Sequence, residues 1–303
     1  EVVWQWHLWD HLVQDVDSND DNYGVIADHP ELFNINNGNI GGGGPGGANA
    51  DWIHLNAISY NADFDQIVIS SHHQDEIFVI DHSTTTEAAT GHTGGNYGKG
   101  GDFLYRWGNP QNYDRGNNSY HLIGSQHSIS WIPEGYPGEG NFILFNNAGN
   151  EAVEFVPPMD ENGFYFIEDN EPYGPDDIIW DSPYYNTAMQ GGAFRLPNGN
   201  TLITDCDSAE IEEITENGNM VWSYSQGGNN ANIARAQKYA TDYFDAVDEG
   251  IPGDINSDGI LNVLDVVSLV NLVLENDYEE AGDINGDGIL NVLDVVTLVN
   301  LVL

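Results

Sequence analysis

The sequence of 303 residues has few basic side chains: six Lys and Arg stand against 49 Asp and Glu, for a formal net charge of −43 with histidine neutral. Such an anionic surface repels phosphate backbones and acidic lipid headgroups, so we expect no nucleic-acid partner. There is no uncharged apolar run of about 18 residues, which argues against membrane insertion. The single cysteine, Cys206, excludes an internal disulfide.

Apolar residues are nevertheless plentiful: 40% of the chain is hydrophobic and 11% aromatic, enough for a large core. Residues 1–248 are rich in Gly, Asn, Trp and Tyr and read as short strands and turns, whereas residues 253–303 are rich in Leu, Val, Ile, Asn and Asp. We therefore predict two domains joined by a linker at residues 249–252. The acidic excess is explained either by a solubility coat for extracellular surroundings or by carboxylates that bind divalent cations.

The second region is a direct repeat, because residues 253–274 and 282–303 are identical at 20 of 22 positions. Each copy opens with oxygen-bearing side chains at the spacing of a calcium loop, with glycine at the sixth position. The predicted Ca²⁺ ligands of the first loop are Asp254, Asn256, Asp258, the carbonyl of Ile260, Asn262 and Asp265. Those of the second loop are Asp283, Asn285, Asp287, the carbonyl of Ile289, Asn291 and Asp294.

Each loop ends in Asp rather than Glu and is followed by one predicted helix, an arrangement that resembles a type I dockerin module. The resemblance implies that two Ca²⁺ ions fold the module and that it docks on a cohesin-like protein partner. The predicted helix at 263–274 is apolar nearly all round apart from a narrow polar stripe. Either the two helices bury each other and the first domain, or part of their apolar surface binds a partner.

In the first region a strand–turn–strand unit recurs at residues 65–80, 141–156 and 200–214. Aromatic strands recur as well, at residues 3–6, 104–107, 179–180 and 221–224. Regular units of this kind predict a mainly β fold, a β-propeller, in which 1–248 holds about four or five blades. Because open sheet edges are unfavourable, we expect missing N-terminal blades, or a second copy or companion chain that completes the ring. The start at Glu1 is consistent with a processed or truncated product.

A further strand precedes each unit, at residues 54–60, 127–131 and 192–196, and would be the innermost strand of its blade. Tyr60 and Trp131 occupy equivalent positions in two of these strands, and His54 and His127 precede them by six and four residues. Both offsets are even and side chains alternate along a strand, so the two histidines are expected on the same strand face. The innermost strands of a propeller line its channel. The two imidazoles are therefore predicted to converge there.

Several motifs in residues 1–245 together resemble the bacterial arylsulfotransferase family: Trp9–Asp15, Asn22–Gly24, His29–Leu32, Asp51–Asn56, Ile80–Thr86, Tyr105–Pro110, Gln126–His127 and Arg195–Ile203. The resemblance implies a six-bladed propeller and sulfate transfer between phenols through a sulfated histidine, without a nucleotide sulfate donor. His54 and His127 match the family's channel histidines and are expected to bind sulfate or act as acid and base. Arg195 is either structural or a third candidate catalytic residue, and no motif identifies the nucleophile.

The chain departs from the family pattern where the family has arginine: His72 and His73 follow one strand, and the loop at 148–152 is short. Adjacent strand residues point to opposite faces, so only one of these two histidines is expected to face a given site. Two hypotheses follow. The first is an extracellular, arylsulfotransferase-like enzyme acting on aryl sulfates and phenols. The alternative is a non-catalytic extracellular binding or structural protein on the same scaffold.

Overall fold

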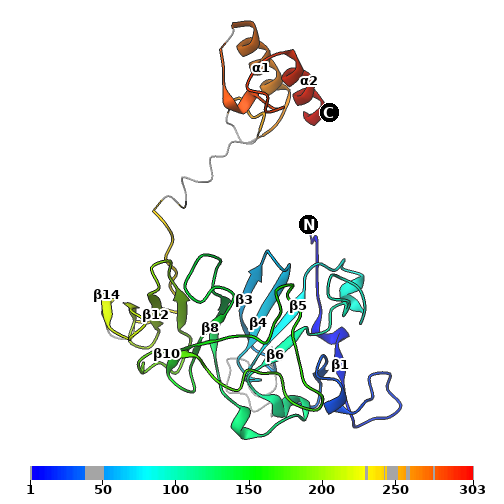
Figure 1. The fold of residues 1–303 in the computed structure, drawn as a ribbon, viewed down its shortest axis with the longest axis vertical. Coiled ribbons are helices and arrows are strands. Elements are labelled where there is room, and N and C mark those ends of the chain that lie inside the picture. Colours follow the sequence, from blue (N-terminus) through cyan, green and yellow to red (C-terminus); the bar gives the residue numbers. More distant parts are fainter. Residues whose placement is uncertain are drawn as a thin grey trace. The chain divides into compact units, whose positions relative to one another are not determined.

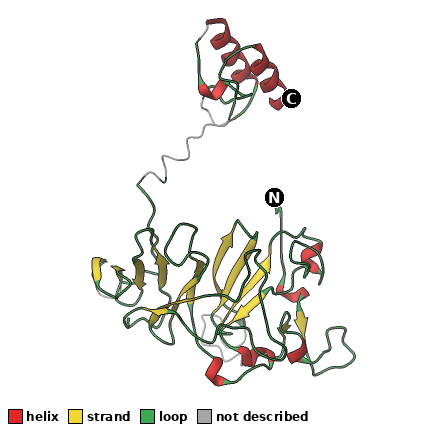
Figure 2. Cartoon of the chain, in the orientation of Figure 1, coloured by secondary structure: helices red, strands yellow, loops and turns green. Residues whose placement is uncertain are grey.

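The chain divides into two compact units, Glu1–Lys238 and Tyr239–Leu303, in the computed structural model. The structure describes residues 2–37, 51–228, 231–241, 243, 252–256, 260–275 and 277–302, so 249–251 of the predicted linker lie outside it. The strands lie in the first unit and the two α-helices in the second (Figures 1 and 2). We call the first unit the body and the second the C-terminal unit. None of the helices within the described ranges is long and apolar enough to cross a membrane.

The body contains three four-stranded antiparallel sheets, each formed by strands that follow one another in the chain. The first consists of β3 (Leu55–Asn61), β4 (Gln66–Ser71), β5 (Glu76–Asp81) and β6 (Tyr105–Trp107). The second consists of β7 (His127–Trp131), β8 (Phe142–Asn146), β9 (Glu151–Phe155) and β10 (Trp180–Asp181). The third consists of β11 (Gly192–Arg195), β12 (Thr201–Asp205), β13 (Glu210–Ile214) and β14 (Met220–Ser225). This is the predicted blade pattern, and the mainly β, propeller-like fold is confirmed.

The number of blades is smaller than expected, because the described residues form three such sheets and not four or five. The predicted strand at residues 3–6 is an extended segment outside any sheet. Its tryptophans, Trp4 and Trp6, pack instead against the first sheet, and Trp6 Nε1 donates to the carbonyl of Gly101 at 2.7 Å. The remaining strands are the parallel pair β1 (Leu12–Val13) and β2 (Phe33–Asn34).

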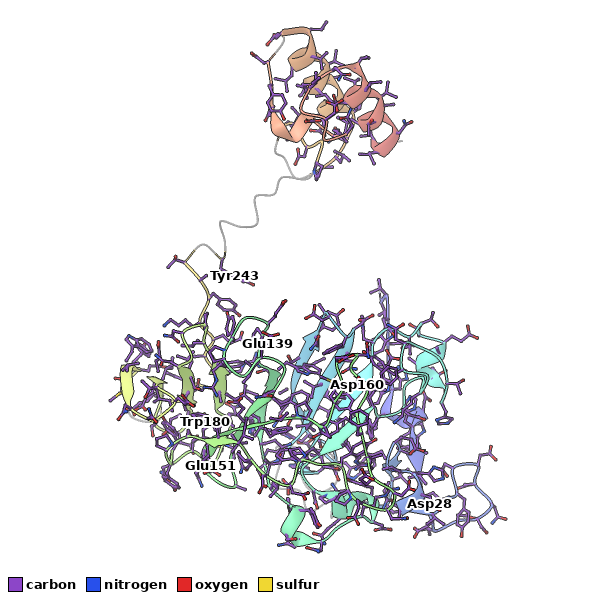
Figure 3. The ribbon with its side chains drawn as sticks, viewed as in Figure 1. Asp28, Glu139, Glu151, Asp160, Trp180 and Tyr243 are labelled. Carbon is purple, nitrogen blue, oxygen red and sulfur yellow. The ribbon has the colours of Figure 1, made fainter. Side chains whose placement is uncertain are left out.

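Short 3-10 helices complete the body: η1 (Leu8–Asp10), η2 (Ile26–Asp28), η3 (Ala88–Thr90), η4 (Pro110–Tyr113) and η5 (Asn118–Tyr120). They interrupt the long connections around the sheets. Acidic side chains such as Asp28 and Glu139 lie exposed on the body surface (Figure 3). These exposed carboxylates are consistent with the predicted solubility coat.

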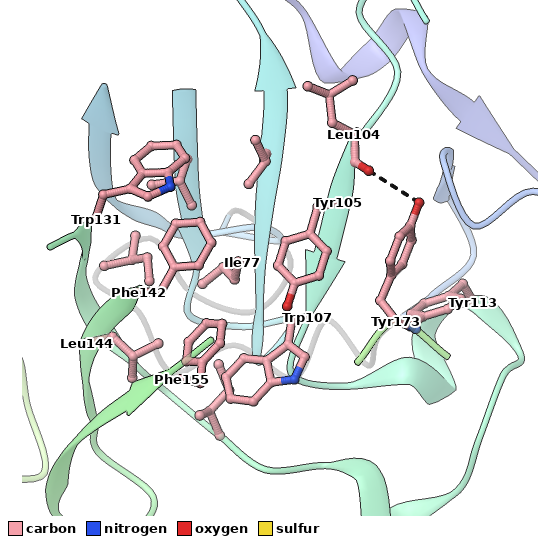
Figure 4. Close-up of a cluster of buried hydrophobic side chains, with 14 of the residues drawn as sticks. Ile77, Leu104, Tyr105, Trp107, Tyr113, Trp131, Phe142, Leu144, Phe155 and Tyr173 are labelled. Atoms are coloured by element: carbon pink, nitrogen blue, oxygen red, sulfur yellow. Dashed lines mark hydrogen bonds between the residues drawn. The ribbon is translucent and has the colours of Figure 1, made fainter. Parts of the chain in front are cut away.

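The largest hydrophobic cluster lies between the first two sheets (Figure 4). Ile77 of β5 and Phe142 of β8 belong to it, and Trp107 stacks on Phe155 with ring centroids 3.8 Å apart. A second cluster joins the second and third sheets through buried residues of β8, β9, β11, β12 and β13. The sheets therefore pack face to face in chain order, which sets β3 beside β7 and β7 beside β11.

A buried ion pair holds the first sheet to the N-terminal segment. Arg106 Nε and Nη2 donate to Glu76 Oε1 and Oε2 at 2.9 and 2.6 Å. Asn112 Nδ2 donates to the same carboxylate at 2.7 Å, and Arg106 Nη1 donates to the Leu32 carbonyl at 2.9 Å. Both charged side chains are fully buried. Burial raises the pKa of Glu76, against the lowering effect of Arg106.

The C-terminal unit consists of α1 (Val263–Glu275), η6 (Glu280–Gly282) and α2 (Val292–Val302). The predicted helices therefore form after each loop. Ile255, Leu269 and Leu298 are the buried hydrophobic residues at its centre. The two helices contact each other through this small core.

Candidate functional site

The first residues of β3, β7 and β11 lie next to one another in the body. Asn56 Nδ2 donates to the carbonyl of Gln126 at 2.7 Å, which joins the starts of β3 and β7. Ser128 Oγ donates to the carbonyl of Gly191 at 3.2 Å, which joins the starts of β7 and β11. The inner strands thus begin at one common end, as expected for strands around a channel.

Four imidazoles gather at this end, and we call them the histidine cluster: His54, His72, His73 and His127. The ring of His72 lies 5.0 Å from that of His54 and 5.4 Å from that of His127, measured between centroids. The ring of His73 lies 4.9 Å from that of His54 and 5.0 Å from that of His72. The predicted pair, His54 and His127, is thus brought together through His72.

The expectation that only one of His72 and His73 faces a given site is wrong. These residues lie in the turn between β4 and β5 and not in a strand. Side-chain alternation applies to strands and not to turns. Both rings therefore contact His54.

The backbone around His54 and His127 is irregular. The register of β3 shifts between Leu55 and Ala57, and that of β7 shifts between His127 and Ser130. His54 and Ser128 have positive φ angles of 48° and 54°, which are uncommon for residues other than glycine. A β-bulge changes the direction of the side chains beside it. The proximity of His54 and His127 therefore depends on bulges, which a simple count of residues along the strands does not take into account.

The ring of His127 is held in one orientation. Its Nδ1 lies 2.8 Å from Asn147 Oδ1 and 3.1 Å from the Ser125 carbonyl. Asn147 Nδ2 donates to the carbonyl of Gln190 at 2.6 Å, so Asn147 Oδ1 is an acceptor. Because both partners of Nδ1 accept, Nδ1 carries the proton and the neutral ring has its lone pair on Nε2.

His54 and His73 share a partner in Asp51. The carboxylate of Asp51 accepts a short hydrogen bond from His54 Nδ1, which lowers the pKa of Asp51. His73 Nδ1 lies 2.6 Å from the backbone carbonyl of Asp51. One ligand atom from each of these three residues lies within 4.8 Å of the others, so the group could also hold a metal ion.

Burial favours the uncharged forms of His72 and His127 by lowering the pKa of both imidazoles. Burial, followed by the neighbouring imidazoles of His127 and His54, lowers the pKa of His72 to about 4. Burial also lowers the pKa of His127, against the hydrogen bonds to Asn147 and Ser125. Nδ1 of His72 is a buried atom with no hydrogen-bond partner among the described residues. The arrangement can therefore present unprotonated ring nitrogens to a ligand.

The structure places Arg195 outside the cluster. The residue ends β11, and its Nη2 donates to the buried carboxylate of Glu154 while Nη1 donates to the Gly199 carbonyl at 3.2 Å. The guanidinium carbon lies 4.9 Å from the ring centroid of Trp180, a residue labelled in Figure 3. These contacts hold Arg195 between the second and third sheets.

Sequence reasoning assigned no role to Asp51 and Asn147, which contact the cluster, or to Arg235. The side chain of Arg235 passes the start of β11: its Cγ lies 3.1 Å from the point where a Cβ on Gly192 would be. Ser128 Oγ lies 3.2 Å from the same point. Arg235 is exposed. Arg235 and Ser128 lie more than 100 residues apart in the sequence, so no short sequence pattern joins them.

In the C-terminal unit the second loop closes on its own side-chain oxygens. Asp283 Oδ1 and Oδ2 accept from the backbone N–H groups of Asp287 and Gly288 at 3.1 and 2.7 Å. Asp294 accepts from Asn291 and Ile284 at 2.9 and 3.1 Å. Gly288 has a φ of 79°, which favours glycine at this turn. Carboxylate, amide and carbonyl oxygens are the ligand types that Ca²⁺ prefers, so the residues of this loop fit a Ca²⁺ site.

The first loop repeats these contacts in its described part. Asp265 accepts from the backbone N–H groups of Asn262 and Asn256 at 2.8 and 3.3 Å, as Asp294 does in the second loop. Asn262 Nδ2 donates to the Ile260 carbonyl at 2.9 Å. The predicted ligand Asp258 lies outside the described residues. Asp265, which begins the predicted polar stripe of 263–274, is fully buried, and so is its counterpart Asp294.

Apolar side chains also remain exposed on both helices. On α1 the exposed residues include Leu264 and Val267, and on α2 they include Leu293 and Val296. These residues occupy equivalent positions in the two copies of the repeat. The C-terminal unit thus buries one apolar face of each helix and leaves another exposed.

Residues 1–163 match the family model of arylsulfotransferase (ASST), more than half of the chain. The chain belongs to the arylsulfotransferase family. Residues 252–303 of this arylsulfotransferase-family chain match the dockerin type I domain, a domain that generally binds calcium. Among curated proteins none matches the sequence.

Solved structures resemble this arylsulfotransferase-family chain only remotely. Virginiamycin B lyase from Staphylococcus aureus has 15% identity and a TM-score of 0.29, over 60% of this chain and 44% of the lyase chain. A streptogramin B lyase has 11% identity and a TM-score of 0.30, over 61% and 58%. Regucalcin, a calcium-binding protein from Agrobacterium tumefaciens, has 15% identity and a TM-score of 0.26, over 59% and 62%. The chain spans less than two thirds of each, and at these scores the likeness carries no argument about function.

Proposed function

We propose that the body transfers sulfuryl groups between phenolic compounds at the histidine cluster. The observation that carries this proposal is that His54, which directly precedes β3, and His127, which begins β7, both lie beside His72 in a chain of the arylsulfotransferase family. Family membership supplies the reaction class, and the cluster supplies unprotonated imidazoles beside a carboxylate.

His127 has the geometry best suited to a nucleophile. Nucleophilic attack needs a neutral imidazole with a free lone pair, and Asn147 holds the proton of His127 on Nδ1. In the first step Nε2 attacks the sulfur of an aryl sulfate, the bond from sulfur to the aryl oxygen breaks, and the phenolate leaves. In the second step an acceptor phenol attacks the same sulfur and the N–S bond breaks.

His54 and Asp51 are suited to proton transfer in both steps. The Asp51 carboxylate orients His54 through Nδ1, and a carboxylate partner stabilises the imidazolium. His54 then protonates the leaving phenolate and later takes the proton from the acceptor phenol. The proton is thus conserved over one transfer.

The sulfate oxygens require donors, and Arg235 is the basic residue that fits this role. Its Cγ lies 3.1 Å, and Ser128 Oγ 3.2 Å, from the point where a Cβ on Gly192 would be, and Ser128 follows His127 in β7. A cation beside a transferring sulfuryl group stabilises the charge that develops on its oxygens. Arg195, the earlier candidate, is held by Glu154 and Trp180 instead.

The test is transfer of sulfate from p-nitrophenyl sulfate to phenol by the full chain. We expect His127→Ala to abolish transfer, and His54→Ala and Arg235→Met to lower the rate by about 100-fold or more. His29→Ala is the matched control, since His29 pairs with Glu31 at 3.0 Å and lies outside the cluster. Absence of turnover in the wild type, or unchanged turnover in His54→Ala and His127→Ala, would refute the enzymatic proposal.

A second candidate function is non-catalytic binding on the same scaffold. This candidate is favoured because four of the six basic side chains already bind protein groups away from the histidine cluster in the described structure. Arg106, Arg195 and Lys238 pair with Glu76, Glu154 and Glu213, and Arg115 donates to backbone carbonyls. Under this hypothesis aryl sulfates bind to the wild type without turnover, and Arg235→Met weakens that binding.

For the C-terminal unit we propose calcium-dependent docking on a cohesin-type protein outside the cell. The dockerin match and the repeated oxygen-rich loops support this role. The exposed residues Val267 and Val296 are candidates for the docking surface. We expect binding to a cohesin in Ca²⁺ and none in EDTA, and a Val267→Asp, Val296→Asp double variant to lose binding while retaining its helical circular dichroism.

A further inference from the structure

A second group of titratable side chains lies away from the histidine cluster, beneath the N-terminal segment. His11 directly precedes β1, and His92 and Asp102 lie in the connection between β5 and β6. Nδ1 of His11 and Nδ1 of His92 each lie 2.8 Å from Asp102 Oδ1. His11 and Asp102 are buried, whereas the His92 side chain is 59% exposed. His92 and Asp102 line a cavity of about 510 Å³.

Both ring nitrogens of His11 face oxygen acceptors. Nε2 lies 2.8 Å from the backbone carbonyl of Ala89, which can only accept, so Nε2 carries a proton. In the neutral ring Nδ1 then holds a lone pair, which faces the Asp102 carboxylate at 2.8 Å. Two acceptors at this distance need either a shared proton or a metal ion between them.

The surroundings of His11 match those of metal-binding histidines, whose second N–H group is commonly held by a backbone carbonyl. Residue 101 has to be glycine for this bond to exist, because a Cβ there would lie 2.2 Å from the Ala89 oxygen and 2.5 Å from His11 Nε2. The indole of Trp6 stacks parallel to the His11 ring, with centroids 5.7 Å apart. The ring is therefore fixed with Nδ1 directed at Asp102 and His92.

We propose that His11, His92 and Asp102 bind one transition-metal ion such as Zn²⁺. Two imidazole nitrogens and one carboxylate oxygen form a typical zinc ligand set, and three protein ligands leave a fourth position for water or a small ligand. Ca²⁺ prefers six to eight oxygen ligands and does not match. Acidic side chains at the cavity, among them Asp10 and Glu31, favour entry of a cation.

The test is calorimetric titration of Zn²⁺ into the full chain with its dockerin loops saturated with Ca²⁺. The parent protein carries His54→Ala and His73→Ala, which remove the other three-residue group that could hold a metal among the described residues. We expect one Zn²⁺ per chain in the parent. Adding His92→Ala should weaken binding by more than about 100-fold, beyond the usual effect of an outer-shell partner.

The control is His29→Ala in the same parent, because His29 lines the same cavity without touching Asp102; it should retain full Zn²⁺ binding. Since His92 is exposed, its replacement should leave the thermal midpoint of tryptophan fluorescence unchanged. Co²⁺ should produce visible absorption bands in the parent that are absent after His92→Ala. A parent that binds no Zn²⁺, or equal affinity with and without His92, would leave only a buried hydrogen bond between His11 and Asp102 and overturn the proposal.

Discussion

The body and the C-terminal unit reach a folded state by different means. Buried aromatic and aliphatic clusters lie between the sheets of the body, whereas the C-terminal unit buries three hydrophobic residues at its centre, Ile255, Leu269 and Leu298. Small units usually need a metal ion or a disulfide in addition to such a core. Packing between sheets is thus extensive in the body, whereas the small core of the C-terminal unit agrees with our proposal that it also depends on Ca²⁺.

The buried carboxylates of the two units also have different partners. All six basic residues lie at or before Lys238, so no lysine or arginine follows in the sequence. In the body, buried Glu76 and Glu154 are each paired with an arginine. In the C-terminal unit, buried Asp265 and Asp294 accept only N–H groups among the described contacts. No basic side chain thus neutralises Asp265 or Asp294 among the described contacts, as the proposed Ca²⁺ binding requires.

The largest expected effect is the loss of the C-terminal fold when Ca²⁺ is removed. All eight tryptophans lie in the body, so tryptophan fluorescence reports on the body and helical circular dichroism reports mainly on α1 and α2. We expect EDTA to abolish the helical signal and to leave the fluorescence spectrum unchanged, since metal binding is coupled to folding. Retention of the helical signal in EDTA, or equal loss of both signals, would contradict the comparison.

The next effect concerns the buried pair in the body. Arg106→Met leaves the Glu76 carboxyl buried without its cation, which we expect to lower the free energy of unfolding by about 3–5 kcal/mol. The measurement is denaturant unfolding followed by tryptophan fluorescence. The Arg106→Met, Glu76→Gln double variant serves as the control and should recover part of the loss. A loss below about 1 kcal/mol in the single variant would show that the pair contributes little to the body.

A third effect depends on pH and is confined to the body, since no histidine follows His127 in the sequence. The pKa of His72 is about 4 in the folded state and about 6.5 when unfolded. Between these values the unfolded state binds the proton first, so stability falls as pH falls from 6.5 to about 4 and His72 adds no further change below that.

This contribution is measured as the thermal midpoint of tryptophan fluorescence against pH for wild type and His72→Gln. The variant should lose part of the decline between pH 6.5 and about 4. Superimposable profiles would show that His72 remains accessible to protons in the folded body.

The smallest expected effect lies at the end of the body. Lys238 Nζ donates to Glu213 Oε2 at 2.6 Å, and this bond, followed by those from Asn200 and Asn198, lowers the pKa of Glu213 to about 2. Lys238 is 55% exposed, so Lys238→Met should cost about 0.2–1 kcal/mol at neutral pH. Because the folded pKa is depressed, the difference should vanish as pH falls from about 4.5 to 2. A larger loss would indicate a structural role for this last basic residue.

Much of the fold follows from local sequence pattern. The strand–turn–strand units at 65–80, 141–156 and 200–214 correspond to adjacent strands of the three sheets. Alternation and turn residues act over a few positions, so they can be recognised in one sequence. The pattern was misleading at residues 3–6, where an aromatic strand was expected and the tryptophans instead cover the first sheet.

The candidate site was only partly predictable. The motif resemblance identified His54 and His127. The positions of His72 and His73 depend on a turn, and the orientation of the His127 ring depends on its hydrogen bond to Asn147. Arg195 was assigned as a candidate without knowledge of Glu154, its partner in another sheet. Such contacts join residues far apart in the chain, and no spacing rule covers them.

By itself, the sequence determined the two-part organisation, the repeated calcium loops and the scarcity of cations, because these depend on composition and on spacing within a few residues. Only the tertiary structure decided which imidazoles meet, which arginines are engaged by carboxylates, and that His11 faces acceptors on both sides. The physical reason is that sheet packing and strand bulges set the direction of each side chain, and both arise from contacts between distant segments.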